Sequence, residues 1–211
     1  MTVENQVKKN IVEQFEGIPT TCVSDALQGL NNLSAVIKPL KEEYHIVGRA
    51  FTVKMPVGDN LVVLKAIREA KPGDVLVIDA KGDTYRAIAG DFIVGMAQTL
   101  GIKGIIVDGV IRDIVGIKEL DYPVFCKGTT IAASGKAGEG EINVPISCGG
   151  ASIRPGDIVV GDADGVVVIP QEIEEEVLKQ SLEKVTKDIK RAQKVSGNEE
   201  EILAYLDRFL S

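Results

Sequence analysis

The 211-residue chain has little of what nucleic-acid or membrane proteins need. Aromatic residues make up 4% of it, and its formal net charge is −7. A nucleic-acid groove needs a basic face and rings on which bases stack, so we expect no nucleic-acid partner. No apolar run approaches the roughly 18 residues of a membrane helix, and the first residues do not form a basic flank followed by an apolar run. We therefore expect a cytoplasmic protein with no membrane contact.

Cysteine, histidine and nucleotide-binding motifs are also scarce. Cys22, Cys126 and Cys148 are odd in number, widely spaced and without a Cys-x-x-Cys pair, which predicts free buried thiols. His45 is the single histidine and cannot form a histidine-based metal cluster. No Gly-x-Gly-x-x-Gly follows an expected strand, and no Gly-rich loop ends in Gly-Lys-Ser/Thr. A nucleotide or S-adenosylmethionine site therefore has no support.

The spacing of apolar residues predicts an α/β domain. Helices are expected at 7–15, 22–30, 61–70, 90–100, 114–120, 171–192 and 202–210. Strands are expected at 44–56, 75–79, 104–108 and 124–126, with strand pairs between 141 and 169 and a hairpin turn at 162–165. Thr21 is the expected cap of the second helix. Asp25 would then lie in its first turn as a dipole or capping residue, so we leave it out of the site.

One stretch, 90–113, combines a helix start with a strand end that carries Arg-Asp. Phe92, Met96 and Leu100 share the expected buried face of its helix, and Gly101 can end that helix. Gly104 to Asp108 then reads as a buried strand, after which Gly109 turns the chain towards Arg112 and Asp113. The helix start and the strand end are therefore candidate ends of one pocket.

Each part of this candidate pocket suits a 2-oxo acid. The first N–H groups of a helix lack internal partners, so residues 90–93 can bind a carboxylate or phosphate. Arg112 offers a planar donor fork to a carboxylate or a developing enolate oxygen, and Asp113 offers a hard oxygen ligand to Mg²⁺ or Mn²⁺. Each part also has a simpler explanation: Gly90 can serve close packing alone, and Arg112 and Asp113 can pair with each other.

The stretch resembles the RraA-like family, which includes the 4-hydroxy-4-methyl-2-oxoglutarate/oxaloacetate aldolases. The family hallmark is a Gly, about twenty residues, Arg-Asp, and an acidic residue three positions after the Asp. Gly90, Arg112 and Asp113 fit it, whereas Gly116 stands at the acidic position. The resemblance covers roughly residues 17 to 170 and includes the segments 20–27, 58–60, 71–79, 143–146 and 161–170.

The resemblance implies a swivelling β/β/α fold over residues 1–170. Residues 171–211 would be a C-terminal helical extension that packs on the same domain or on a neighbouring subunit. The family forms three-fold assemblies, so a homotrimer or a dimer of trimers with a pocket between subunits is expected. In that pocket the backbone N–H groups of Gly90, Asp91, Phe92 and Ile93 would bind the substrate carboxylate. Arg112 would stabilise the enolate, and Asp113 would hold a divalent cation, Mg²⁺ or Mn²⁺.

The implied activity is that of a metal-dependent class II pyruvate aldolase. It would cleave 4-hydroxy-2-oxo acids such as 4-hydroxy-4-methyl-2-oxoglutarate, and would decarboxylate oxaloacetate through the same pyruvate enolate. Because Gly116 lacks the acidic side chain, we expect slow turnover that Gly116→Glu or Gly116→Asp would accelerate. The alternative is a non-enzymatic regulator that binds and inhibits ribonuclease E. Such sequences are sometimes labelled demethylmenaquinone methyltransferases, but this sequence contains no motif for the methyl-donor cofactor.

Overall fold

The computed structural model describes residues 10–210 and has a mixed eight-stranded sheet at its centre. Its main path runs β1-β7-β5-β3-β2-β13-β14, and β10 pairs with β2. The strands are β1 (Lys38–Pro39), β2 (Ile46–Lys54), β3 (Asp74–Asp79), β5 (Gly104–Val107), β7 (Val124–Cys126), β10 (Glu141–Ile142), β13 (Ile158–Asp162) and β14 (Gly165–Ile169). The expected α/β class and the 162–165 hairpin turn are both confirmed.

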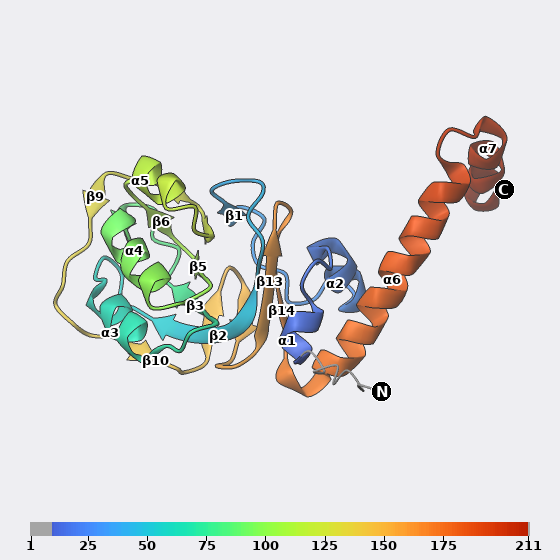
Figure 1. Ribbon diagram of the computed structural model, residues 1–211. Coiled ribbons are helices and arrows are strands. Elements are labelled where there is room, and N and C mark those ends of the chain that lie inside the picture. Colours follow the sequence, from blue (N-terminus) through green and yellow to red (C-terminus); the bar gives the residue numbers. More distant parts are fainter. Residues whose placement is uncertain (1–9, 211) are drawn as a thin grey trace, which may run out of the picture.

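The middle of this sheet is parallel and buried on both faces. Strands β2, β3, β5 and β7 run parallel, and their near-continuous apolar sequences are typical of such strands. One face packs against α3 (Leu61–Glu69), α4 (Asp91–Thr99) and α5 (Ile114–Glu119), as Figure 1 shows. The other face packs against the hairpin of β11 (Ile146–Cys148) and β12 (Ala151–Ile153).

A second, four-stranded parallel sheet positions the candidate site. Its order is β8-β6-β4-β9, formed by β8 (Gly128–Thr129), β6 (Val110–Ile111), β4 (Arg86–Ala87) and β9 (Ala132–Ala133). Strands β4, β6 and β8 each follow the carboxyl end of a main-sheet strand, β3, β5 and β7 respectively. Because β4 and β6 are parallel neighbours, the two segments that follow them, which lead into α4 and α5, lie side by side.

Helices from the first and last parts of the described chain pack on the far side of the β13–β14 hairpin (Figure 1). Helices α1 (Ile11–Gln14) and α2 (Thr20–Ala26) meet the start of α6 (Glu174–Val195), which follows a short 3₁₀ helix η1 (Gln171–Ile173). Helix α7 (Glu199–Leu210) lies at the end of α6. The expected helices at 171–192 and 202–210 are thus present with shifted bounds. Residues 7–9 of the expected first helix lie outside the described residues.

The start of α2 differs from the prediction. Pro19, not Thr21, precedes the helix, and no side chain caps it. Instead, Thr20 donates its N–H and its hydroxyl to the carboxylate of Asp162, at 2.9 and 2.6 Å, so a tertiary contact fixes the helix start. Asp25 consequently lies in the last turn, where it pairs with Lys184 of α6 at 2.9 Å. It is neither a cap nor a first-turn dipole residue.

The exposed face of α4 also differs from the prediction. Phe92 is 76% exposed and Leu100 50% exposed, because α4 packs on the core through the smaller Val94 and Ala97. The predicted end of the helix is correct: Gly101 follows it with a φ of 77°, a conformation that favours glycine. Helix α4 therefore leaves large apolar side chains on the surface.

The expected state of the cysteines is confirmed. Cys22, Cys126 and Cys148 are free and buried, and burial raises the pKa of each thiol. Among residues 10–210, no helix combines the length and the apolarity that a membrane crossing requires.

Candidate active site

The structure brings Gly90, Arg112 and Asp113 together. Beyond the paired strands β4 and β6, Ile88 N–H donates to the Val110 carbonyl at 2.9 Å. Arg112 N–H likewise donates to the Ala89 carbonyl at 3.0 Å. These bonds extend the pairing to the point where α4 and α5 begin. The predicted helix start and the predicted Arg-Asp pair therefore lie at one place.

Gly90 is required by this closeness. A Cβ atom at Gly90 would overlap Oδ2 of Asp113, and would lie 3.3 Å from Asp113 Cγ and 3.4 Å from Arg112 Cγ. The backbone of Gly90 has a φ of −126°, which any residue adopts. Space, and not conformation, therefore excludes a side chain here.

Asp113 is held in an unusual conformation with its carboxylate accessible. Its φ of 58° and ψ of 40° are left-handed, a region in which Asp is tolerated better than most residues. It precedes α5, yet its side chain does not cap that helix. The carboxylate Oδ2 lies 3.3 Å from Nε of Arg112, and both side chains are 44% exposed. The pair is thus open to solvent and to a ligand.

The start of α4 provides fewer donors than the sequence predicts. Phe92 N–H donates to Oδ1 of Asp91 at 2.7 Å, and is therefore occupied. Within the described part of the chain, the N–H groups of Asp91 and Ile93 form no hydrogen bond. The N–H group of Gly90 forms no hydrogen bond there either, so the predicted four-residue cradle at 90–93 offers a ligand three free donors, and a neighbouring carboxylate occupies the fourth.

Asp91 also explains the missing acidic residue at 116. A Cβ atom at Gly116 would lie 2.7 Å from Oδ2 and 3.0 Å from Cβ of Asp91. Gly116 lies one turn of α5 beyond Asp113, so the Asp91 carboxylate occupies the space where an acidic side chain at 116 would begin. Helix α4 thus places a carboxylate beside position 116, the position of α5 at which the family pattern has an acidic residue. Sequence reasoning overlooked this role, although Asp91 directly follows Gly90.

Comparison with known proteins decides the family. Residues 20–168 match the family model described as RraA-like, Aldolase/RraA. The chain belongs to the RraA-like family. A relative in Halalkalibacterium halodurans, provisionally named 4-hydroxy-4-methyl-2-oxoglutarate aldolase, is 59% identical over 206 residues, which are 98% of each chain.

Solved RraA-like structures share the fold to different extents. The Streptomyces coelicolor protein RraAS2, described as an unusual member of the RNase ES inhibitor RraA family, matches with a TM-score of 0.77 and 30% identity, covering 87% of this chain and 97% of its own. The RNA-processing inhibitor RraA of Thermus thermophilis matches with a TM-score of 0.67 and 30% identity, covering 72% of this chain and 92% of its own. The match to the Thermus structure therefore leaves out more than a quarter of this chain.

The carboxylates of this RraA-like site fit a hydrated Mg²⁺ or Mn²⁺ ion. Asp113 and Asp91 offer hard oxygen atoms, and the exposure of Asp113 leaves room for water. Among residues 10–210, no group of three His, Cys, Asp or Glu residues is placed to hold a metal ion. A protein cage is therefore absent from the described residues. Mg²⁺ commonly binds through one or two carboxylates and keeps several waters, which matches this donor set.

Neighbouring polar groups hold the segment that leads into Gly90, a role that the sequence pattern does not indicate. Asn60 Nδ2 donates to the Ile88 carbonyl at 2.8 Å, and Ser134 Oγ donates to the Ala87 carbonyl at 2.8 Å. Asp59 accepts from the N–H groups of Leu61, Ala137 and Gly138, and these bonds lower its pKa. The 134–138 loop and the start of α3 are thereby fixed against β4.

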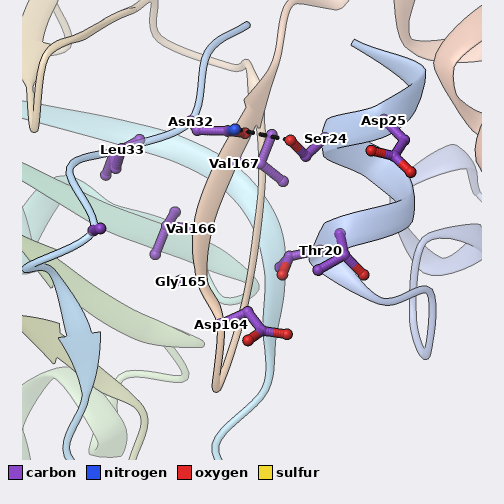
Figure 2. A pocket seen from close by; sticks show the side chains of 11 residues that line it. Thr20, Ser24, Asp25, Asn32, Leu33, Asp164, Gly165, Val166 and Val167 are labelled. Carbon is purple, nitrogen blue, oxygen red and sulfur yellow. Dashed lines mark hydrogen bonds between the residues drawn. The ribbon is translucent and has the colours of Figure 1, made fainter. Parts of the chain in front are cut away.

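A separate cavity of about 270 Å³ lies between α2 and the β13–β14 hairpin (Figure 2). Ser24 and Asn32 are joined beside it by a 2.8 Å hydrogen bond, and Asp25 and Asp164 also line it. Helix α2 and helix α4 lie on opposite sides of that hairpin (Figure 1), so this cavity is distinct from the Gly90–Asp113 site. The carboxylate of Asp25 ties α2 to α6 through Lys184.

Proposed function

We propose that this protein is a divalent-metal-dependent class II pyruvate aldolase. It cleaves 4-hydroxy-2-oxo acids such as 4-hydroxy-4-methyl-2-oxoglutarate, and it decarboxylates oxaloacetate. The observation that carries the proposal is the contact of Gly90 with Arg112 and Asp113 beside the free N–H groups of α4. The 59% identity to a relative with the corresponding provisional name supports the same reaction class.

The arrangement suits binding of a 2-oxo acid. The free N–H groups of Asp91 and Ile93, at the positive end of α4, bind the carboxylate next to the oxo group. Arg112 is half-exposed and directs its guanidinium donors at the adjacent 2-oxo oxygen. Its contact with Asp113 is an exposed pair, and such pairs contribute about 0–1 kcal/mol, so a substrate oxygen can replace it at little cost.

Both reactions break the C3–C4 bond and leave its electron pair on the pyruvate fragment. In the aldol cleavage the C4 hydroxyl gives its proton to solvent water and becomes a carbonyl, whereas oxaloacetate loses C4 as CO₂. The electron pair delocalises onto the C2 oxygen, where Arg112 stabilises the negative charge, and C3 then takes up a proton to give pyruvate. A divalent cation held by Asp113 supplies Lewis-acid stabilisation of that oxygen when it is bound. Asp91, whose carboxylate lies beside Gly116 of α5, would orient water around such an ion.

The test is metal-dependent release of pyruvate. Purified protein should release pyruvate from oxaloacetate and from 4-hydroxy-4-methyl-2-oxoglutarate with Mg²⁺ or Mn²⁺, above the rate of the metal ion alone. EDTA should abolish the difference. If neither substrate yields pyruvate above that background across both metal ions, the proposed activity is wrong.

Inhibition of ribonuclease E remains the second candidate function. The specific observation in its favour is structural similarity to the Thermus RraA inhibitor at 30% identity. The glycine at position 116 does not by itself favour this function, because the carboxylate of Asp91 lies beside that position. A ribonuclease E pull-down with an RNA-cleavage assay tests this function. Inhibition by a protein that releases no pyruvate would favour the regulator.

A further inference from the structure

The three peptide carbonyls before Gly90, at residues 87–89, each accept a hydrogen bond from a different part of the chain. The donors are, in order, Ser134 Oγ at 2.8 Å, Asn60 Nδ2 at 2.8 Å and the Arg112 N–H at 3.0 Å. The first two are side chains, because the pairing of β4 with β9 ends at residue 87. Rotation of such a peptide would leave a buried carbonyl without a partner, which costs free energy. These bonds therefore fix the backbone from which α4 starts.

Asn60 does not use its side chain for the helix that it precedes. It stands at the N-cap position of α3, where an asparagine oxygen commonly accepts an N–H of the first turn. Its side chain makes no such bond, and Asp59 accepts the Leu61 N–H instead, at 3.1 Å. Asn60 is 6% exposed, and its Oδ1 is buried without a hydrogen-bond partner among residues 10–210. An unpaired buried oxygen costs stability, so the amide group serves the one bond that it does form, to the Ile88 carbonyl.

The loop after β9, which carries the second side-chain donor, is bonded to the same segment before α3. Gly135 donates its N–H to the Gly58 carbonyl at 2.7 Å and accepts from the Asn60 N–H at 3.1 Å. The carboxylate of Asp59, a residue that is 7% exposed, accepts from the N–H groups at 137 and 138. The two side-chain donors therefore belong to one unit, which Asp59 and Gly135 hold together.

The first turn of α4 has little packing of its own. Asp91 and Phe92 are exposed, and the first buried side chain of the helix is that of Val94. A hydrogen bond weakens steeply when its angle falls below about 120°, so the free N–H groups of this turn bind a carboxylate well only when the turn is correctly oriented. Because side-chain packing contributes little to that orientation, the bonds to the carbonyls at 87–89 are its main support.

We propose that Asn60 and Ser134 are positioning residues, which orient the N–H groups at the start of α4 for the carboxylate of a 2-oxo acid. The identity of that ligand rests on the proposed function. Neither side chain contacts the substrate, because each acts through a backbone carbonyl, at 88 and at 87 respectively. The N–H groups hold the same carboxylate in the ground state and in the transition state. Loss of either donor should therefore weaken substrate binding and leave the chemical step almost unchanged, in contrast to Arg112→Lys.

The experiment uses two full-length variants, each of which removes one donor. Asn60→Leu replaces the amide with an apolar group of similar size, and Ser134→Ala removes only a hydroxyl. Because Ser134 is half-buried, Ser134→Ala still provides the test should Asn60→Leu fail to fold. Ser134→Thr keeps the hydroxyl and is the conservative variant. Thr52→Val is the matched control: it removes a hydroxyl that donates to the Val144 carbonyl at 2.6 Å, a bond that involves none of residues 87–90.

Steady-state kinetics of pyruvate release from oxaloacetate give the first measurement. In Asn60→Leu and in Ser134→Ala the KM should rise by roughly five- to tenfold, the effect of one ordinary hydrogen bond, with kcat within about twofold of wild type. Ser134→Thr and Thr52→Val should keep the wild-type KM. A fall in kcat at unchanged KM would overturn the proposal, and so would an equal rise in KM in Thr52→Val.

Amide hydrogen exchange gives a second measurement that does not use activity. The Val94 N–H donates to the Gly90 carbonyl at 3.0 Å and reports on the first turn of α4, whereas the Ile105 N–H, bonded to the Pro123 carbonyl at 3.0 Å, reports on the central sheet. Relative to the Ile105 amide, the Val94 amide should exchange roughly five- to tenfold faster in both donor variants and at the wild-type rate in the control.

The two measurements separate this proposal from the proposed reaction. Faster exchange at Val94 in a protein that releases no pyruvate would support the positioning role and contradict the reaction alone. Unchanged exchange at Val94 in both donor variants would overturn the positioning role, even in an active enzyme.

Discussion

Asp108 and Asp113 lie on either side of β6, and the structure treats them in opposite ways. The carboxylate of Asp108 is 13% exposed, pairs with Lys127 and accepts the Gly149 N–H at 3.0 Å. The carboxylate of Asp113 is 44% exposed and faces Arg112 at 3.3 Å. Both aspartates follow an apolar strand and have a basic partner, so residue type does not distinguish them. They differ in the burial of the carboxylate and in the number of its partners.

The energetic consequences of the two pairs also differ. Removing one member of a buried pair leaves an unpaired charge in a poorly hydrated place, which costs roughly 3–5 kcal/mol. An exposed pair contributes about 0–1 kcal/mol and can exchange its partner for a ligand. The Asp108–Lys127 pair therefore serves the fold, whereas Arg112 and Asp113 are available for chemistry. The predictions below test this division, in order of decreasing expected effect on turnover.

Asp113→Ala should have the largest effect. The substitution removes the hard oxygen ligand, so metal-dependent pyruvate release from oxaloacetate should fall to the background of the metal ion alone. Its unfolding free energy should fall by no more than about 1–2 kcal/mol, because alanine tolerates the left-handed conformation of residue 113 less well than aspartate, whereas the exposed Arg112 contact contributes little. Steady-state kinetics and urea unfolding measure the two quantities. Wild-type activity together with wild-type Mn²⁺ affinity would show that Asp113 is not the ligand.

Arg112→Lys should lower the turnover number by ~10²–10³ and weaken substrate binding less. Lysine keeps the positive charge but loses the planar donor fork that meets the enolate oxygen as charge develops there. A coupled pyruvate assay over a range of oxaloacetate concentrations separates kcat from KM. A rise in KM at unchanged kcat would instead assign Arg112 to ground-state binding.

Gly116→Ala should lower turnover by roughly 10–100-fold, the range typical of groups that act on a metal ion through water. Its Cβ would lie 2.7 Å from Oδ2 of Asp91 and displace that carboxylate. The same clash reverses the expectation from sequence that Gly116→Glu accelerates the enzyme. Gly95→Ala is the matched control in α4, because its Cβ would lie 3.9 Å from the nearest atom, of Leu120. A faster Gly116→Glu enzyme would contradict this interpretation of Asp91.

The sequence predicts the buried strands from their apolar runs. It predicts the meeting of Gly90 with Arg112 and Asp113 from a helix start, a strand end and the spacing that resembles the family. It does not predict the role of Asp91, since the approach of α4 to α5 depends on tertiary packing. From the sequence alone, Gly116 indicates that the site lacks an acidic side chain. The structure shows that the carboxylate of Asp91 occupies the space beside Gly116.

Two errors have a similar origin. Phe92 has the spacing of a core residue, yet α4 packs through its smaller side chains, so helical period alone does not choose between two apolar faces. Asp25 has the place of a capping residue only if Thr21 starts the helix. The long-range contact of Thr20 with Asp162, 142 positions away, moves that start. Apolar periodicity thus predicts that a helix has a packed face and an approximate start. Contacts with residues far away in the sequence decide which face is packed and at which residue the helix starts.

Asp108→Asn should have the smallest effect on turnover and the largest on stability. Asparagine still accepts the Gly149 N–H, but the Lys127 ammonium, whose side chain is 21% exposed, loses its counter-charge. We expect the unfolding free energy to fall by roughly 3 kcal/mol. The kcat for oxaloacetate should stay within about threefold of wild type under conditions in which the protein is folded. Apolar groups can often replace a buried ion pair without loss of stability. The double variant Asp108→Asn with Lys127→Met should therefore be more stable than Asp108→Asn alone. Urea unfolding of the two variants, and of Asp113→Asn as the exposed counterpart, measures the contrast. If Asp108→Asn loses turnover as severely as Asp113→Asn at full stability, the buried pair takes part in the chemistry, and the division between the two aspartates is wrong.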